Sequence, residues 1–411
     1  MPLSFVRLAA LLALAVVPSL HAQNTQARVV PGITVLIRDS IHLLRGKRVG
    51  LITNHTGRDA KGVSSIDLLA RAPGVRLTAL FGPEHGLRGV AEAGEKVASS
   101  IDSATGVTVF SLYGSTRVPT AEMLRTVDVL VYDIQDVGSR TYTYAWTMAL
   151  SADAAGRAGI PFIVCDRPVP VRGDVVAGGI LDTAFRSFVG QYPVALRYGL
   201  TAGEMLRHLV RTGQVHANVT VVPMQGWRRA MWYDQTGLPW IRPSPNLKTL
   251  DAALLYTGTV FIEGTNLSEG RGTDAPFQLV GAPWLTDAGA IAKALSANPA
   301  MVGVRLDSVS RTIAPGQKHA GLTIPMIRLT VTDRNAVEPV RVGMMLLSAI
   351  RSRHPTDLVL RTRFLDQLAG DTSLRLALEA NSMPGMMAAY DAWRAAAVRF
   401  AAATRVDQLY R

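Results

Sequence analysis

The first half of the chain alternates short apolar runs with segments whose apolar residues recur at helical spacing. The apolar runs predict strands at residues 33–37, 49–53, 77–81, 107–112, 127–132 and 161–165. The helical spacing predicts helices at residues 65–71, 121–125 and 143–158. Short, mostly apolar strands that alternate with helices are typical of a parallel sheet covered on both faces. We therefore expect an α/β fold with a doubly wound, mainly parallel sheet.

The pattern changes in the last third of the chain. Helices are predicted there at residues 288–295, 342–353 and 386–403. Ile327, Leu329 and Val331 alternate with polar residues, as on a half-buried strand. These elements predict a smaller α+β domain over residues 287–411. Pro, Gly and Trp are frequent at about 185–285, where we expect ordered loops that decorate the sheet.

The N-terminus has the pattern of a secretory signal peptide. Arg7 precedes an apolar run at 8–17, and Pro18 and a small-residue exit follow it, which predicts a signal peptide over residues 1–22. A membrane anchor is disfavoured because the run is shorter than the roughly 20 residues that span a bilayer. Cys165 is the only cysteine, so no internal disulfide is expected. We expect an exported protein, periplasmic or secreted, that does not associate with the membrane once the signal is removed.

Composition narrows the choice of partner. The formal net charge of the 411 residues is +12, which favours anionic partners. The arginines are scattered rather than clustered with aromatic residues, so a nucleic-acid binder is disfavoured. An anionic polymer outside the cytoplasm, such as peptidoglycan, fits better. A dinucleotide site is also disfavoured, because the glycine pattern at 270–275 runs into Pro276 and cannot open a helix.

Three polar segments stand out in a chain that is 48% hydrophobic and 18% charged. The segment 261–277 places several charged side chains among three glycines, and its carboxylates would need partners to be buried. The segments 133–144 and 82–89 directly follow the predicted strands 127–132 and 77–81. Ligands of open α/β sheets bind beyond the carboxyl ends of the strands. We therefore expect one active site assembled from strand ends.

The residue types in these segments suit glycoside hydrolysis, which needs two carboxyl groups on either side of the glycosidic bond. The candidates for catalysis are Glu84, His85, Asp133, Asp136 and Glu263. The candidates for substrate binding are Asn54, Arg88, Gln135, Arg140, Tyr142, Asn266, Glu269 and Arg271. We expect neither a metal nor another cofactor, because no closely spaced histidine pair supports a metal site.

Several candidates also have a structural interpretation. Aspartate commonly ends strands and caps helices, so Asp133 or Asp136 can serve there instead. Glu263 and Glu269 can pair with Arg271 rather than face a substrate.

Four long motifs resemble the exo-β-N-acetylmuramidase family, once known only as a domain of unknown function. They lie at residues 51–57, 81–89, 132–140 and 263–273, and shorter matches lie at 187–190 and 243–246. The resemblance covers nearly all of the chain after the signal peptide. It departs at 165–170, where the family usually has Asn between the two prolines.

The resemblance implies a hydrolase that releases terminal N-acetylmuramic acid from the non-reducing end of peptidoglycan fragments. It also implies a Rossmann-like catalytic domain, which we place at residues 23–286, and a cleft between this domain and the auxiliary domain. Glu84 is the first choice for the general acid. Arg140 and Arg271 are the candidates for binding the lactyl carboxylate, because guanidinium binds carboxylate bidentately.

Two other classes of protein stay open. A periplasmic sugar- or muropeptide-binding protein shares the two-lobed architecture and the export signal, but it releases no monosaccharide. A metal-dependent amidase or esterase of the cell wall loses its activity on chelation.

Overall fold

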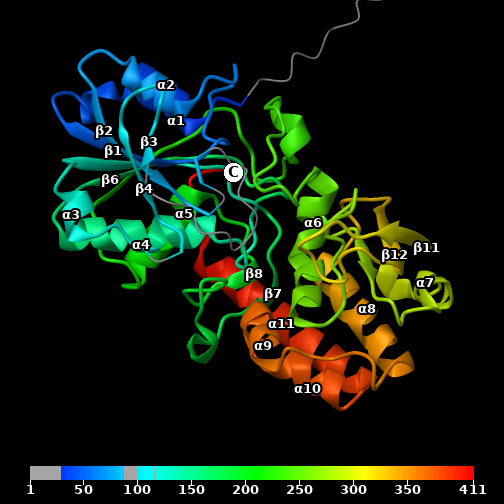
Figure 1. Ribbon diagram of the computed structural model, residues 1–411. Helices are drawn as coiled ribbons and strands as arrows, with labels where there is room; N and C mark the ends of the chain where they lie inside the picture. The colour runs from blue at the N-terminus through cyan, green and yellow to red at the C-terminus, as the bar shows by residue number, and fades with distance from the viewer. Residues whose placement is uncertain (1–28, 85, 88–99, 115) are drawn as a thin grey trace, which may run out of the picture.

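A seven-stranded, mainly parallel sheet forms the centre of the first half of the chain (Figure 1). The computed structural model describes residues 29–84, 86–87, 100–114 and 116–411. The strands of the sheet are β1 (Arg48–Thr53), β2 (Arg76–Gly82), β3 (Ser100–Ile101), β4 (Thr108–Ser111), β5 (Val129–Asp133), β6 (Phe162–Cys165) and β9 (Val219–Val222). Their order is β3-β4-β2-β1-β5-β6-β9, and every pair is parallel except β3 with β4. The predicted α/β fold class is confirmed.

Helices cover both faces of this sheet because successive strand residues point to opposite sides. The helices are α1 (Gly32–Asp39), α2 (Ser65–Ala70), α3 (Ala121–Leu124), α4 (Tyr144–Arg157) and α5 (Ala202–Arg211). Leu51 faces the core that contains residues of α1 and α2, whereas Ile52 faces the core that contains residues of α4 and α5. Both cores are fully apolar at their centres, which fixes the register of the central strands.

The strand predicted at 33–37 is wrong, because these residues lie in α1. Ile33 and Leu36 are one helical turn apart, and both are fully buried, on the side where α1 packs against β6 and β9. The β-branched residues in this run favour a strand locally. Burial of one helical face against the sheet outweighs that preference.

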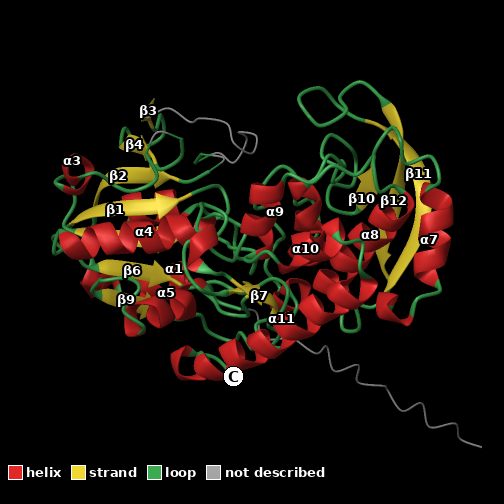
Figure 2. Cartoon of the chain, turned by 90° about the horizontal axis from the view of Figure 1, so that it is seen from below, coloured by secondary structure: helices red, strands yellow, loops and turns green. Residues whose placement is uncertain are grey.

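A second region contains a three-stranded antiparallel sheet in the order β10-β12-β11 (Figure 2). Its strands are β10 (Leu279–Gly281), β11 (Val304–Thr312) and β12 (Thr323–Val331). The helices of this half are α6 (Leu250–Thr259), α7 (Ala288–Ser296), α8 (Pro339–Arg353), α9 (Thr362–Ala369), α10 (Ser373–Glu379) and α11 (Met383–Ala403). The predicted C-terminal helices and the strand through 327–331 are confirmed. β10 precedes the predicted domain boundary and pairs with β12 beyond it, and the boundary itself stays a prediction.

The last residues of the sequence return to the first region. α11 packs against β7 (Ala177–Ile180), which pairs with β8 (Ala195–Arg197). Beyond α11, the Tyr410 hydroxyl donates to Asp166 Oδ2 at 2.7 Å, at the end of β6. Arg211 Nη2 lies 2.7 Å from Asp407 Oδ2. None of the helices in the described part of the chain is both long and apolar enough to cross a membrane.

Candidate active site

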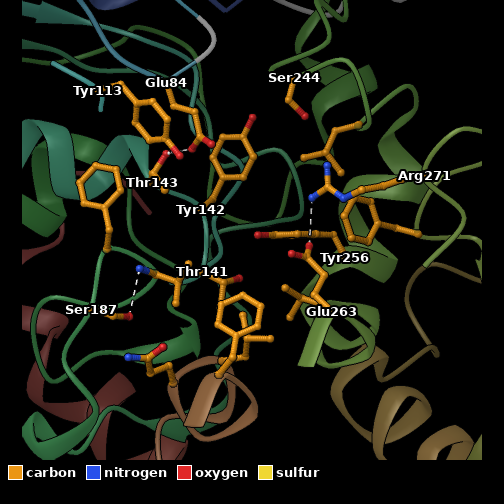
Figure 3. A pocket seen from close by; sticks show the side chains of 18 of the residues that line it. Glu84, Tyr113, Thr141, Tyr142, Thr143, Ser187, Ser244, Tyr256, Glu263 and Arg271 are labelled. Carbon is orange, nitrogen blue, oxygen red and sulfur yellow. Dashed lines mark hydrogen bonds and ion pairs between the residues drawn. The ribbon is translucent and has the colours of Figure 1, made fainter. Parts of the chain in front are cut away.

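A pocket of about 360 Å³ lies where the loops of the parallel sheet face the helices of the second half (Figure 3). Glu84, Tyr113 and Thr143 come from the first region and line one side. Tyr256, Glu263 and Arg271 line the opposite side. The volume is at the lower end of the range for small-molecule sites, which is about 300–1,000 Å³. It suits a single substituted sugar ring.

Glu84 is positioned by the end of β2 and by the start of α4. The strand is buried from Ala79 to Gly82, and Glu84 follows it after Pro83. The Thr143 hydroxyl donates to Glu84 Oε2 at 2.7 Å, and Thr143 is the residue that precedes the first turn of α4. A helix N-terminus carries a partial positive charge, which favours a carboxylate nearby. The contact fixes the Glu84 carboxyl group at the pocket wall.

Glu263 lies on a short 3₁₀ turn, Val260–Gly264, that continues α6. Its Oε1 atom is 3.0 Å from Arg271 Nη2, and its side chain is 21% exposed. Arg271 Nε lies 3.0 Å from Glu269 Oε1, and Lys318 Nζ lies 3.0 Å from Glu269 Oε2. Burial raises the pKa of Glu263 above the ordinary glutamate value, and the charge of Arg271 opposes this shift without cancelling it. Glu263 therefore protonates more readily than an exposed glutamate.

The glycines on both sides of Arg271 have the left-handed backbone that only glycine adopts without strain. Gly270 has φ of 81° and Gly272 has φ of 80°. A β-carbon at Gly272 would lie 3.0 Å from the backbone nitrogen of Ala314. The loop therefore holds Arg271 over the ring of Phe277, at 5.1 Å from the ring centroid, in a conformation that depends on glycine.

Two tyrosine side chains line the pocket together with the two carboxyl groups. The ring centroids of Tyr142 and Tyr256 are 6.0 Å apart in an edge-to-face arrangement, and both rings line the pocket. Burial raises the pKa of Tyr142 well above its usual range, so its hydroxyl stays protonated and can donate a hydrogen bond. Tyr144 points away, because its hydroxyl donates to the carbonyl oxygen of Pro243 at 2.6 Å.

The aspartates at the centre of the sheet edge do not line the pocket, contrary to expectation. Asp133 is fully buried and pairs with Arg167, whose Nε lies 2.6 Å from Asp133 Oδ1. The Ser65 hydroxyl also donates to Asp133. Asp133 and Arg167 thus form a buried structural ion pair.

Asp136 occupies a similar closed environment. Its Oδ2 accepts a hydrogen bond from the Tyr198 hydroxyl at 2.5 Å, and burial raises its pKa to about 6. The void that Asp136, Arg167 and Tyr198 line has a volume of only about 10 Å³. That is about the room that one water molecule requires, and no sugar fits there.

The predicted amide ligands from the first region are also buried outside the pocket. Gln135 donates from Nε2 to the carbonyl oxygens of Asp136 and Pro168, at 2.8 and 2.7 Å. Asn54 Oδ1 accepts hydrogen bonds from the backbone and hydroxyl groups of Thr56, at 2.9 and 2.6 Å. Both side chains order the loops beneath the site rather than touch its cavity.

Arg140 is not available to a substrate carboxylate. It is fully buried, and its Nη2 donates to the carbonyl oxygens of Leu368 and Ala369 at 3.0 and 2.9 Å. A cation at the C-terminal end of α9 is favoured by the helix dipole. Burial lowers the pKa of Arg140 to about 10, so the side chain stays charged at neutral pH.

Asn266 and Glu269 interact with other parts of the protein rather than face the pocket. Asn266 donates to the carbonyl oxygen of Asp357 at 2.8 Å and accepts from the backbone nitrogen of Val359 at 3.0 Å, so it anchors a loop. Glu269 is 4% exposed and serves as a partner of Arg271 and Lys318. His85 and Arg88 lie outside the described residues.

Several pocket residues were missed in the sequence. They include Arg117, Thr143, Phe188, Tyr256 and Phe364. The short motifs at 187–190 and 243–246 already pointed to parts of the pocket, since Ser187 and Ser244 also line it. Within the described ranges, no group of His, Cys, Asp and Glu side chains is arranged to hold a metal ion.

Comparisons with known proteins agree with this architecture. The chain is 45% identical to the peptidoglycan beta-N-acetylmuramidase NamZ of Bacillus subtilis (strain 168) over 353 residues, which cover 86% of this chain and 84% of that protein. A crystal structure of a DUF1343 family protein from Bacteroides fragilis NCTC 9343 is similar, with a TM-score of 0.86 and 34% identity, over 93% of this chain and 99% of that chain. A second DUF1343 family protein from the same organism has a TM-score of 0.73 and 28% identity, over 94% of this chain and 99% of that chain.

The match to the family extends through both halves of the chain. Residues 49–251 match the N-terminal part, and residues 254–410 the C-terminal part, of the family described as exo-beta-N-acetylmuramidase NamZ. The chain therefore belongs to the exo-β-N-acetylmuramidase NamZ family.

Proposed function

We propose that this protein is an exo-acting glycoside hydrolase that releases terminal N-acetylmuramic acid from the non-reducing end of peptidoglycan fragments. Family membership and the Bacillus subtilis relative support this function. The observation that carries it in the structure is the pair of carboxyl groups, Glu84 and Glu263, that face one pocket from opposite sides. Such a pair is the minimum that most glycoside hydrolases need.

In this proposal Glu84 delivers the proton to the leaving glycosidic oxygen. Glu263 is the second carboxylate, and Arg271 holds it in place beside the sugar. The second carboxylate either attacks the anomeric carbon or activates a water molecule, and the separation of the two groups around the bound sugar decides which. Tyr142 and Tyr256 also line the pocket, and their hydroxyl groups can bind ring substituents.

We further propose that the protein acts outside the cytoplasm, where peptidoglycan is found. The pattern of residues 1–22 supports export, and the mature protein would begin near residue 23. Cell fractionation followed by N-terminal sequencing tests this part independently of the enzymatic activity.

The direct test is hydrolysis of an aryl β-glycoside of N-acetylmuramic acid and of a muramic-acid-terminated disaccharide. We expect release of the monosaccharide from both, resistance to chelators, and loss of turnover in Glu84→Gln. Binding without release would instead identify a solute-binding protein, and loss on chelation a metal-dependent hydrolase. The anomeric configuration of the first product, measured by NMR, then assigns Glu263 as nucleophile if retained or as general base if inverted.

A further inference from the structure

One arginine that lines the pocket has no carboxylate partner among the described residues. Arg117 lies in the loop after β4 and lines the pocket. Its side chain is exposed, and no ion pair or hydrogen bond to a carboxylate involves it in the described part of the chain. Its guanidinium group stacks on the ring of Phe188, whose centroid is 4.5 Å from the guanidinium carbon. A cation in a ligand pocket without an anionic partner is a candidate for binding an anionic ligand.

The other two arginines that could take this role are occupied. Arg271 already lies within 3.0 Å of both Glu263 and Glu269, so a third carboxylate there would meet two negative charges. Arg140 donates to backbone carbonyl groups at the end of α9 and is fully buried. Among the described residues, Arg117 is therefore the pocket arginine that is exposed and has no carboxylate partner.

Stacking on Phe188 prepares the guanidinium for such a ligand. A ring beneath one face of the guanidinium fixes its plane and leaves the N–H groups at its edge free. Those edge groups match the two oxygens of a carboxylate. Since β4 is the neighbour of β2 in the sheet, the loop that carries Arg117 lies on the same side of the pocket as Glu84.

We propose that Arg117 binds the carboxylate of the lactyl ether, the group that distinguishes N-acetylmuramic acid from N-acetylglucosamine. The inference rests on the proposed function for the identity of the sugar. It assigns selectivity to a residue outside the motif that contains Arg271. The bound sugar then has its lactyl substituent directed toward the loop after β4 and its glycosidic oxygen toward Glu84.

The test compares aryl glycosides of N-acetylmuramic acid and N-acetylglucosamine that carry the same leaving group. For Arg117→Met we expect kcat/KM to fall about 10- to 100-fold on the muramic glycoside, the range for loss of a hydrogen-bonded charge. On the glucosamine glycoside the value should stay nearly unchanged. Arg117→Lys should be intermediate, because lysine keeps the charge but not the planar fork.

A matched control is Arg341→Met. Arg341 also lies over an aromatic ring, that of Tyr390 at 5.4 Å, but it lies outside the pocket. The control should keep the wild-type ratio between the two glycosides. If Arg117→Met keeps the wild-type ratio of kcat/KM between the two glycosides, whether or not both values fall, the assignment to Arg117 is overturned.

Calorimetric binding of the free sugars separates this inference from the proposed function, because it needs no turnover. Wild-type protein should bind N-acetylmuramic acid more tightly than N-acetylglucosamine, and Arg117→Met should lose that difference. If the wild-type protein hydrolyses the muramic glycoside while Arg117→Met keeps the binding difference, the inference fails and the proposed function stands. If neither glycoside is hydrolysed but the binding difference depends on Arg117, the proposed function fails and the carboxylate site stands.

Discussion

The centre of the sheet edge and the wall of the pocket both present acidic side chains, but the protein uses them differently. At the centre, Asp133 is buried against Arg167, and Asp136 is hydrogen-bonded to Tyr198 beside a void of about 10 Å³. At the pocket, Glu84 and Glu263 face a cavity of about 360 Å³. Position at a strand end therefore does not identify a catalytic carboxylate. What identifies it is whether the neighbouring loops leave room for a ligand above it.

The two pairs of carboxylates differ in the segments that face them. β5 lies next to the central strand β1, and Arg167 from the loop after β6 pairs with Asp133 at the end of β5. β2 and β4 lie toward one side, and the loops beyond them, with Glu84 and Tyr113, line the cavity that the second half of the chain completes. The central carboxylates stabilise the fold that carries the lateral ones.

The largest contrast is expected from Glu84→Gln. This change keeps the shape of the side chain but removes the proton that general acid catalysis delivers, so kcat should fall about 10²- to 10⁴-fold. Thermal unfolding should be unchanged. Glu122→Gln, an exposed change in α3, is the matched control and should keep full activity. Near-native turnover of the natural disaccharide by Glu84→Gln would move the acid to Glu263.

Asp133→Asn should show the opposite pattern, with loss of stability rather than chemistry. It leaves Arg167 buried without its charged partner, and breaking a buried ion pair in this way costs about 3–5 kcal/mol. Urea unfolding measures the loss, and kcat per folded molecule should be close to wild type. The exposed pair Arg48–Asp128 provides the control, since Asp128→Asn should change stability little. A selective loss of kcat in Asp133→Asn would place Asp133 in the chemistry after all.

Asp136 should make the stability of the protein depend on pH. Its pKa is raised from 3.8 to about 6 by burial, so the folded state binds the proton more tightly than the unfolded state. Its contribution is therefore fully present below about pH 4 and is lost as the pH rises through about 6, a difference of about 3 kcal/mol. Asp136→Asn does not titrate, so the unfolding free energy of this variant relative to wild type should increase between pH 4 and 7. A constant difference over that range would contradict a raised pKa.

Gly272→Ala should give a modest loss of stability and a selective loss of activity. A side chain at a φ of 80° costs roughly 1–3 kcal/mol, and its β-carbon would press on Ala314 and displace Arg271. Gly46→Ala is the matched control, because Gly46 has φ of 74° but open space around its β-carbon. Both variants should lose similar stability, and only Gly272→Ala should lose kcat/KM. Equal activity in the two would mean that the loop does not position the site.

The sequence predicted the parts of the fold that depend on local patterns. The apolar run at 127–132 became β5, and the helical spacing at 143–158 became α4. It also predicted Glu84 and Glu263 as pocket residues, because their segments are polar and rich in turn residues. Whether a polar residue faces a ligand or a protein partner depends on contacts that no local pattern encodes. Arg140 shows this most clearly, since its partners Leu368 and Ala369 lie more than 220 residues further along the chain.

The same reasoning applies to Thr143 and Arg117. Thr143 becomes a site residue only because α4 begins beside the loop after β2. Arg117 is notable only because no carboxylate of the described residues pairs with it in the folded chain. A sequence pattern shows which charges a segment has, but not which of them are left over after folding.

The hydrogen bond from Tyr410 to Asp166 joins residues 244 positions apart, and it has a consequence for the order of biosynthesis. At typical synthesis rates, Asp166 emerges about 10–50 s before the residue that satisfies it. Until then Asp166 has the donors Thr201 and Gly203 but not Tyr410, and Glu204 lacks the backbone nitrogen of Leu409. We expect the nascent first region to stay loosely folded until the last residues arrive.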